Sequence, residues 1–316
     1  MIYNIYSDYL KEKYGEKVYK LPVNLPITCP NRDGTCGSGG CIFCGEKGTG
    51  YESLSNQIDV KDQLERNAEY IGKKYGAKKF IAYFQNFRNN YMPPNLFKEY
   101  ISQEYAEKIV GIDVSTRPDC ISEKYLEILA ETGKDITVEL GLQTANYNTL
   151  HRLNRGHGLA EYISAVLKIK TFGFKVCTHV IIDIPYDGTE DVAETAKIIS
   201  VLKSDFVKMH SLYVVKDTVL EKLYSSGDIK LLTAQDYVER CALFLRYLRP
   251  ETVVQRLIGR APEEDTVTAN FGISWWKIKD MILEYMQSNG YVQGDLYRDV
   301  SAAAVEKFTG EQNDKD

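Results

Sequence analysis

The sequence predicts an α/β fold, a partial (β/α)6-type TIM barrel with a C-terminal extension. Short runs of β-branched and aromatic residues alternate with amphipathic stretches of helical period, which is the pattern of βα units. Residues 178–185 are apolar at nearly consecutive positions, as expected for a parallel strand covered on both faces. The 316 residues are 44% hydrophobic and 26% charged, which is typical of a globular protein with a large core.

Seven segments have the composition of strands, namely residues 20–28, 79–85, 110–115, 136–143, 174–184, 206–214 and 252–258. Six segments of helical period lie between them: residues 57–75, 94–108, 122–132, 159–172, 190–202 and 234–247. Right-handed crossovers between such units curl the strands into a barrel whose active site lies at their carboxyl ends. We therefore expect an N-terminal segment (1–20), the barrel (21–250), an extension (251–310) and a disordered polar tail (311–316).

The charge balance excludes a globally basic protein that coats nucleic acid. Lys and Arg number 39 and Asp and Glu 44, which gives a net charge of −5, although a local basic patch remains compatible with this. The first residues do not form a signal sequence, and no apolar run has the length of a membrane span. We expect a cytoplasmic protein without a membrane partner, and the sequence does not indicate an oligomeric state.

Four of the seven cysteines lie between residues 29 and 44. An odd number of cysteines without a secretory signal argues against a disulfide framework. Closely spaced thiolates suit a soft metal or an iron–sulfur cluster, and the Cys41-x2-Cys44 spacing supports this interpretation. A structural zinc knuckle is the alternative that spacing alone leaves open. The predicted position after the first strand, where barrel active sites form, favours a catalytic centre.

With these motifs the chain resembles the radical S-adenosylmethionine (SAM) superfamily, specifically its YhcC-like family, which is related to the radical domain of the Elongator catalytic subunit. The resemblance spans about residues 3 to 300 and lies in residues 19–20, 29–35, 39–44, 83–85, 115–120, 138–144, 154–157 and 176–180. It implies a barrel of the radical SAM type, a [4Fe-4S] cluster, SAM as cofactor and a reducing electron donor of the flavodoxin or ferredoxin type.

The resemblance also implies the ligands of the cluster. By position, Cys29, Cys41 and Cys44 match the three ligating cysteines, with a C-x11-C-x2-C spacing in place of the superfamily's commoner C-x3-C-x2-C. The fourth iron then stays open to bind SAM, from which reductive cleavage gives a 5′-deoxyadenosyl radical. Cys36 has no counterpart in the pattern, so we interpret it as a bystander.

Seven residues are expected to bind the cofactor. Phe43 matches the aromatic residue that contacts adenine, although core packing explains it as well. Ser115, Arg117 and Asp119 follow the third strand and suit ribose hydroxyls or a carboxylate, whereas a helix-capping turn is the alternative. The other candidates also lie at or beyond predicted strand ends: Gln85, Gln143 and Arg155.

The catalytic residues are less defined by the sequence, and the candidates are Gln143, His179 and His210. Both histidines lie within predicted strands, where an inward orientation would place them near the radical site. A histidine within a strand is also compatible with a hydrogen-bonded core residue. His157 belongs to a basic segment that could contact phosphate or be a solvated surface.

The resemblance to the Elongator-type domain implies tRNA as substrate. The reaction it suggests is trimming of a 5-carboxymethylaminomethyl group on the wobble uridine to aminomethyl. Two alternatives remain open: a radical SAM enzyme acting on a peptide or small metabolite, because no RNA-binding module is recognisable, and a zinc-stabilised binding or scaffold protein.

Overall fold

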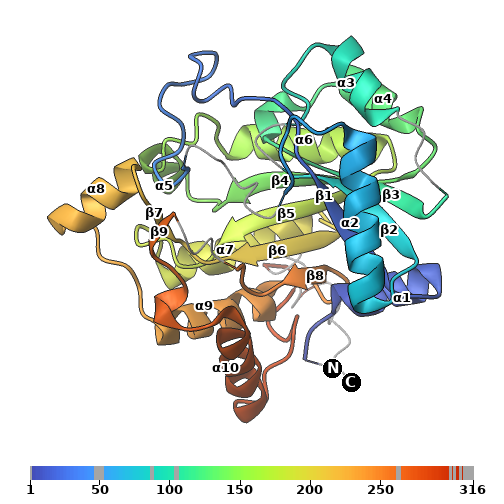
Figure 1. Cartoon of the computed structure of the whole chain (residues 1–316). Helices are drawn as coiled ribbons and strands as arrows, with labels where there is room; N and C mark the ends of the chain where they lie inside the picture. The colour runs from blue at the N-terminus through green and yellow to red at the C-terminus, as the bar shows by residue number, and fades with distance from the viewer. Residues whose placement is uncertain are drawn as a thin grey trace.

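A seven-stranded parallel sheet in the order β1-β2-β3-β4-β5-β6-β8 forms the centre of the molecule (Figure 1). This computed structural model describes residues 2–45, 53–85, 89–102, 107–260, 265–298, 301, 304–305 and 308. The strands are β1 (Val18–Val23), β2 (Lys79–Phe84), β3 (Ile109–Thr116), β4 (Asp135–Gln143), β5 (Lys175–Ile181), β6 (Phe206–His210) and β8 (Val253–Arg256). A second, antiparallel pair consists of β7 (Val214–Val215) and β9 (Thr266–Thr268).

Ten α-helices are assigned within the described residues. They are α1 (Tyr6–Tyr14), α2 (Val60–Tyr75), α3 (Pro94–Ile101), α4 (Glu123–Ala130), α5 (Tyr147–Arg152), α6 (Leu159–Thr171), α7 (Thr189–Val201), α8 (Val219–Ser226), α9 (Ala234–Tyr247) and α10 (Trp275–Ser288). In Figure 1, α5 and α8 lie on the left, toward the carboxyl end of β4, and α1 lies on the right, at the amino-terminal end of the sheet. The expected partial barrel with a C-terminal extension is thus confirmed.

The two faces of the curled sheet differ in chemistry, because successive side chains in a strand point to opposite faces. One set of strand side chains is apolar and forms a continuous core with the apolar stripes of α2, α3, α4, α6, α7, α9 and α10. The other set includes Lys20, Asp113, Glu139 and Lys208, whose charged groups contact one another. The interior of the half-barrel is therefore polar at mid-height.

Helix α1 closes the amino-terminal end of the half-barrel. Its Tyr6 and Tyr9 pack edge-on against Phe206 of β6, and Leu10 is buried against Val18 and Ile81. A crevice of about 270 Å³ between α1 and the first residues of β3, β4 and β5 lies at this end. It is remote from the carboxyl ends of the strands, where barrel enzymes have their active sites.

Several predicted boundaries are wrong. The first strand ends at Val23 and not at residue 28, because the backbone N–H of Asn24 donates to the Gln63 side chain of α2 instead of a strand. The predicted strand 206–214 ends at His210, since the Leu212 N–H donates to Asp183 Oδ1, and residues 214–215 join the small second sheet. The helix predicted for 94–108 ends at Ile101.

The helices α1, α5, α8 and α10 were not among the predicted elements. The predicted tail, residues 311–316, lies outside the described residues. Among the helices that the structure describes, none has both the length and the apolar character needed to cross a membrane.

Candidate active site at the carboxyl end of the sheet

The cysteine loop, residues 29–44, lies between β1 and α2 and packs against the loop between α5 and α6. Cys29 and Cys41 are buried, Cys44 is half-buried and Cys36 is exposed. Two backbone hydrogen bonds fix the loop: the N–H of Ile42 donates to the Leu153 carbonyl at 3.1 Å, and the carbonyl of Ile42 accepts from the N–H of Leu220 at 2.9 Å. The three cysteines expected to bind a cluster are thus shielded from water to a greater degree than Cys36.

Asn31 anchors the cysteine loop to the segment after α5. Its Nδ2 donates to the Asn154 carbonyl at 2.6 Å and lies 3.8 Å from Cys41 Sγ. The side chain passes between two glycines: a Cβ on Gly37 or Gly156 would lie 2.4 or 2.5 Å from Asn31 Oδ1. Gly156 also has φ +68°, a left-handed conformation that glycine tolerates. Glycine is therefore required here for close packing.

Arg155 lies directly beside a cluster candidate. Its Nη1 donates to Cys41 Sγ at 3.1 Å and its Nη2 to the Gly141 carbonyl at 2.6 Å. A Cβ on Gly141 would lie 3.2 Å from that Nη2 and 3.0 Å from Gln143 Nε2, so the glycine lets both side chains approach the end of β4. We expected Arg155 near SAM or substrate, and the structure places its guanidinium on the thiol of Cys41.

The end of β4 has an irregular backbone. Gly141 pairs with His179 and Gln143 with Val180, so Leu142 is an extra residue in the strand. Gln143 has φ +77°, an uncommon conformation for a residue with a Cβ. Such bulges redirect side chains and are frequent next to active sites. Gln143 thus lies at the predicted carboxyl-terminal edge, next to Arg155.

Arg117 and Asp119 form a buried ion pair and not a helix cap. Arg117 Nε and Nη2 donate to the two carboxylate oxygens of Asp119, each at 2.6 Å, and Arg117 is fully buried. Burial opposes its charge, but Asp119 outweighs this effect, and the pKa of Arg117 is raised with further contributions from Cys41 and Cys29. Helix α4 instead has Ser122 at its N-cap, so the capping alternative for Asp119 is wrong.

Phe43, Gln85 and Ser115 are the remaining residues that were expected to bind the cofactor. Phe43 is half-buried and packs against an apolar cluster that includes Ile181. The backbone N–H of Gln85 donates to Val23, which keeps this residue at the carboxyl end of β2. Ser115 Oγ points into the half-barrel and lies 3.2 Å from Glu139. The structure therefore brings Ser115 to the interior rather than to the cysteine loop.

The cysteine loop fits a cluster better than a zinc ion. A tetrahedral site with Zn–S bonds of about 2.3 Å holds its sulfurs roughly 3.8 Å apart. In the described part of the chain, the only three potential ligand atoms found within 4.8 Å of one another belong to Glu139, Cys177 and His179. Among the described residues, no three cysteine thiols therefore lie within 4.8 Å of one another, as a zinc site would need. Thiolates that bind different irons of a cluster do not have to be so close. The buried Arg117 Nη1 has no partner among the described residues, which leaves a donor for an anionic ligand.

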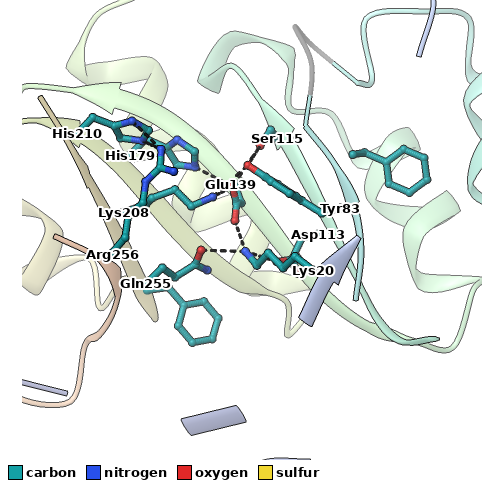
Figure 2. Close-up of polar contacts among 12 residues, drawn as sticks. Lys20, Tyr83, Asp113, Ser115, Glu139, His179, Lys208, His210, Gln255 and Arg256 are labelled. Atoms are coloured by element: carbon teal, nitrogen blue, oxygen red, sulfur yellow. Dashed lines mark hydrogen bonds and ion pairs between the residues drawn. The ribbon is translucent and has the colours of Figure 1, made fainter. Parts of the chain in front are cut away.

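Glu139 is the centre of the polar interior (Figure 2). It accepts from Lys20 at 2.6 Å, Lys208 at 2.7 Å and His179 Nε2 at 2.8 Å, and its side chain is fully buried. Lys20 also contacts Asp113 at 2.6 Å and Gln255 Oε1 at 2.8 Å. The cluster of Glu139, Cys177 and His179 is no obvious metal site, because two ammonium groups already occupy the carboxylate.

Burial and neighbouring charge set the protonation of this interior. Burial raises the pKa of Glu139, but the charges of Lys20 and Lys208 outweigh this effect. The pKa of Glu139 therefore lies well below its usual range, and the carboxyl is ionised at neutral pH. Burial lowers the pKa of Lys208 to about 8, although Glu139 opposes the shift. Burial followed by the charge of Lys208 lowers the pKa of His179 to about 4. At neutral pH the imidazole is therefore uncharged and can donate one N–H to Glu139.

The candidate histidines lie in two places. The rings of His179 and His210 stack with centroids 5.2 Å apart on the inner wall, as the inward orientation predicts (Figure 2). His210 also lies 2.9 Å from Arg256 Nη2. His157 is buried next to Arg155 and the cysteine loop, and burial lowers its pKa to about 2.

Sequence reasoning missed most of the interior network. Lys20, Asp113, Glu139 and Lys208 each stand within an otherwise apolar strand, which was the available signal. Arg256, at the end of β8, was also missed, although its strand begins with two apolar residues.

Two family profiles match the chain. A profile described as the radical SAM superfamily covers residues 31–199, and one described as the radical SAM C-terminal domain covers residues 204–288.

Relatives extend the match over most of the chain. Protein YhcC of Escherichia coli K12 is 31% identical over 295 residues, which are 92% of this chain and 94% of the relative. Elongator complex protein 3 of Homo sapiens is 27% identical over 198 residues, or 60% of this chain and 36% of the relative. The solved Elp3 of the archaeon Methanocaldococcus infernus, with an N-terminal deletion, has the same fold, with a TM-score of 0.65 and 19% identity over 87% of this chain and 64% of that chain.

Proposed function

Because the chain belongs to the radical SAM superfamily, whose enzymes use a [4Fe-4S] cluster and S-adenosylmethionine, we propose that Cys29, Cys41 and Cys44 hold the cluster. When bound, these groups supply a 5′-deoxyadenosyl radical by reductive cleavage of SAM. The exposed position of Cys36 supports its exclusion from the ligand set. A flavodoxin or ferredoxin would deliver the electron, in the cytoplasm.

The residues around the loop have distinct proposed roles. Arg155 donates to the thiolate of Cys41 and so stabilises its negative charge. Asp119 orients Arg117, whose remaining N–H groups are available to an anionic group of SAM. Phe43 would pack against adenine, and Gln85 and Gln143 would line the mouth from β2 and β4.

We further propose that the substrate is tRNA, in which the enzyme trims 5-carboxymethylaminomethyl on the wobble uridine to aminomethyl. The observation that carries this is the polar interior below the cysteine loop, with Glu139 between Lys20 and Lys208. The side chain of this nucleoside combines an amine and a carboxylate, and both need charged or polar partners when they leave water. An apolar interior would not suit it. Similarity to Elongator complex protein 3 supports an RNA substrate.

The first test compares tRNA from cells with and without the gene. We expect the carboxymethylaminomethyl nucleoside to accumulate and the aminomethyl form to disappear, as measured by mass spectrometry of digested tRNA. Unchanged nucleosides would overturn the tRNA proposal and favour a peptide or small metabolite.

The second test concerns the cluster. Cys41→Ala should lose reconstituted iron and the formation of 5′-deoxyadenosine, because one of three ligands is gone. Cys36→Ala is the matched control and should retain about four irons per chain. Equal iron loss in the two variants would contradict the ligand assignment.

A further inference from the structure

Strand β8 contains an extra residue where it passes the interior network. Val207 of β6 pairs with Val254, but Lys208 pairs with Arg256, so Gln255 is inserted between them. A bulge of this kind redirects the side chains around it. Here both Gln255 and Arg256 contact interior groups: Gln255 reaches Lys20, and Arg256 reaches His210 (Figure 2).

The charges of this network do not balance. Its cations are Lys20, Lys208 and Arg256, and its carboxylates are Asp113 and Glu139. Lys20 contacts both carboxylates, and Lys208 contacts Glu139. Arg256 has no carboxylate partner within the described ranges, so its positive charge is in excess.

The neighbour of Arg256 leaves that charge intact. Arg256 Nη2 lies 2.9 Å from Nδ1 and 3.2 Å from Nε2 of His210. Burial, followed by the charge of Arg256 itself, holds the pKa of His210 well below its usual range, so the ring is neutral. Stacking on His179, which is bonded to Glu139, fixes the ring in place. His210 thus orients the guanidinium without neutralising it.

The guanidinium also keeps unused donors. A guanidinium has five N–H groups, and Arg256 Nε is buried without a hydrogen-bond partner in the part of the chain that the structure describes. Gly259 makes room for it: a Cβ there would lie 3.2 Å from Arg256 Nη2 and 2.9 Å from the Tyr213 hydroxyl. A buried donor without a partner is unfavourable, and a carboxylate would satisfy it in a bidentate manner.

From these contacts we infer that Arg256, oriented by His210, forms a subsite for the carboxylate of the substrate. The inference rests on the proposed function, since the carboxymethyl group of the modified uridine is its ligand. The carboxylate of SAM is the less suitable candidate. Two other arginines, Arg117 after β3 and Arg155 between α5 and α6, already lie beside the cysteines of the loop that follows β1. Arg256 instead ends β8, at the other edge of the sheet.

The test measures binding of an anticodon stem-loop RNA with 5-carboxymethylaminomethyluridine at the wobble position, beside the same RNA with its methyl ester. If Arg256 forms a charge-assisted hydrogen bond with the carboxylate, the native protein should bind the RNA with the free acid roughly 10- to 150-fold more tightly than the RNA with the ester. Arg256→Gln should abolish that preference. Gly259→Ala, which presses on the guanidinium without removing its charge, should reduce it. Arg249→Gln is the control, since Arg249 pairs with Glu251 outside the network and the preference should persist.

The outcomes separate the subsite from the proposed function. Equal binding of acid and ester by the native protein, or a preference that survives Arg256→Gln in a folded variant, would overturn the subsite but not the tRNA proposal. A loss of SAM affinity with the RNA preference intact would assign Arg256 to the cofactor and overturn the subsite as well.

If the native protein binds neither RNA, the tRNA proposal fails, and N-methylglycine decides the subsite. Its binding is measured by nuclear magnetic resonance, through the chemical shift of the Arg256 Nε–H group. N-methylglycine methyl ester, which lacks the carboxylate, is the control probe. A shift with the acid alone supports the subsite for a smaller substrate, and no shift with either overturns it.

Discussion

At the scale of single residues, Arg155 joins the cysteine loop to the barrel through its contact with Cys41. Hydrogen bonds to a cluster thiolate stabilise the more negative, reduced state. We therefore expect Arg155→Met to shift the reduction potential of the reconstituted cluster to more negative values. Loss of such a partner typically lowers activity about 10- to 100-fold. A redox titration followed by electron paramagnetic resonance measures the shift, Arg155→Lys should recover part of it, and an unchanged potential would contradict this role.

The lowered pKa of His179 makes stability depend on pH. Its pKa falls from the ordinary 6.5 to about 4 in the folded protein because of burial. Between these values the unfolded chain binds a proton that the folded chain does not bind, so the free energy of unfolding falls as the pH falls from 6.5 to 4. The full effect is about 3 kcal/mol.

Chemical denaturation at several pH values measures this dependence. His179→Gln should reduce it, while the buried His157 and His210 continue to contribute in the same direction. Replacement of the exposed His151 of α5 by Gln should leave the dependence unchanged. Equal slopes in native protein and His179→Gln would refute the assignment.

The sequence predicted the cysteine loop better than the interior. Spacing and resemblance indicated Cys29, Cys41 and Cys44 as ligands of a cluster, because they lie close together along the chain, and this assignment stays a prediction. Glu139 and Lys208 come from β4 and β6 and meet only through the register of the sheet. No local pattern shows such a contact. Charged residues in the middle of apolar strands were the one signal of it.

At the scale of elements, α1 stabilises the barrel by closing its amino-terminal end. Leu10→Ala removes a buried side chain there and should lower the free energy of unfolding by about 2–5 kcal/mol. The control is Leu167→Ala in α6, where the side chain is 55% exposed and should contribute little. Urea denaturation distinguishes the two, and a loss in Leu10→Ala no larger than in the control would mean that α1 packs loosely.

Gly156, in the loop between α5 and α6, and Gly173, just after α6, are a matched pair of glycines. Gly156 and Gly173 both have positive φ, but a Cβ on Gly156 would collide with Asn31, whereas one on Gly173 meets no atom within 4 Å. Either change to Ala should destabilise by about 1–2 kcal/mol through the backbone. Only Gly156→Ala should also reduce the iron content, because Asn31 has to move. Equal iron in both variants would show that Asn31 does not position the loop.

The success of the element predictions depended on amphipathic periodicity. It predicted α9 at residues 234–247 as observed, because one face of this helix is buried. It missed α1, whose aromatic residues pack against the end of the barrel rather than along its side. Strand ends were displaced where side chains such as Gln63 or Asp183 replaced a neighbouring strand as hydrogen-bond partner.

For the whole molecule, alternating strand and helix patterns were sufficient to predict the half-barrel. Right-handed crossovers between parallel strands leave few other arrangements. The family relationship inferred from the motifs is confirmed by the profile and by the relatives. The division at residues 20 and 250 stays a prediction.

Hydrogen bonds join residues 2–4 to β8 and to Gln293, which are far from them in the sequence. The N–H of Val254 donates to the Asn4 carbonyl, and Gln293 receives the Asn4 N–H and donates its own N–H to Ile2. A ribosome adds about 5–20 residues per second, so Asn4 leaves it on the order of ten seconds or more before these partners exist. Residues 2–4 therefore reach their final hydrogen bonds only after residue 293 has been made, and this side of the half-barrel closes late in synthesis.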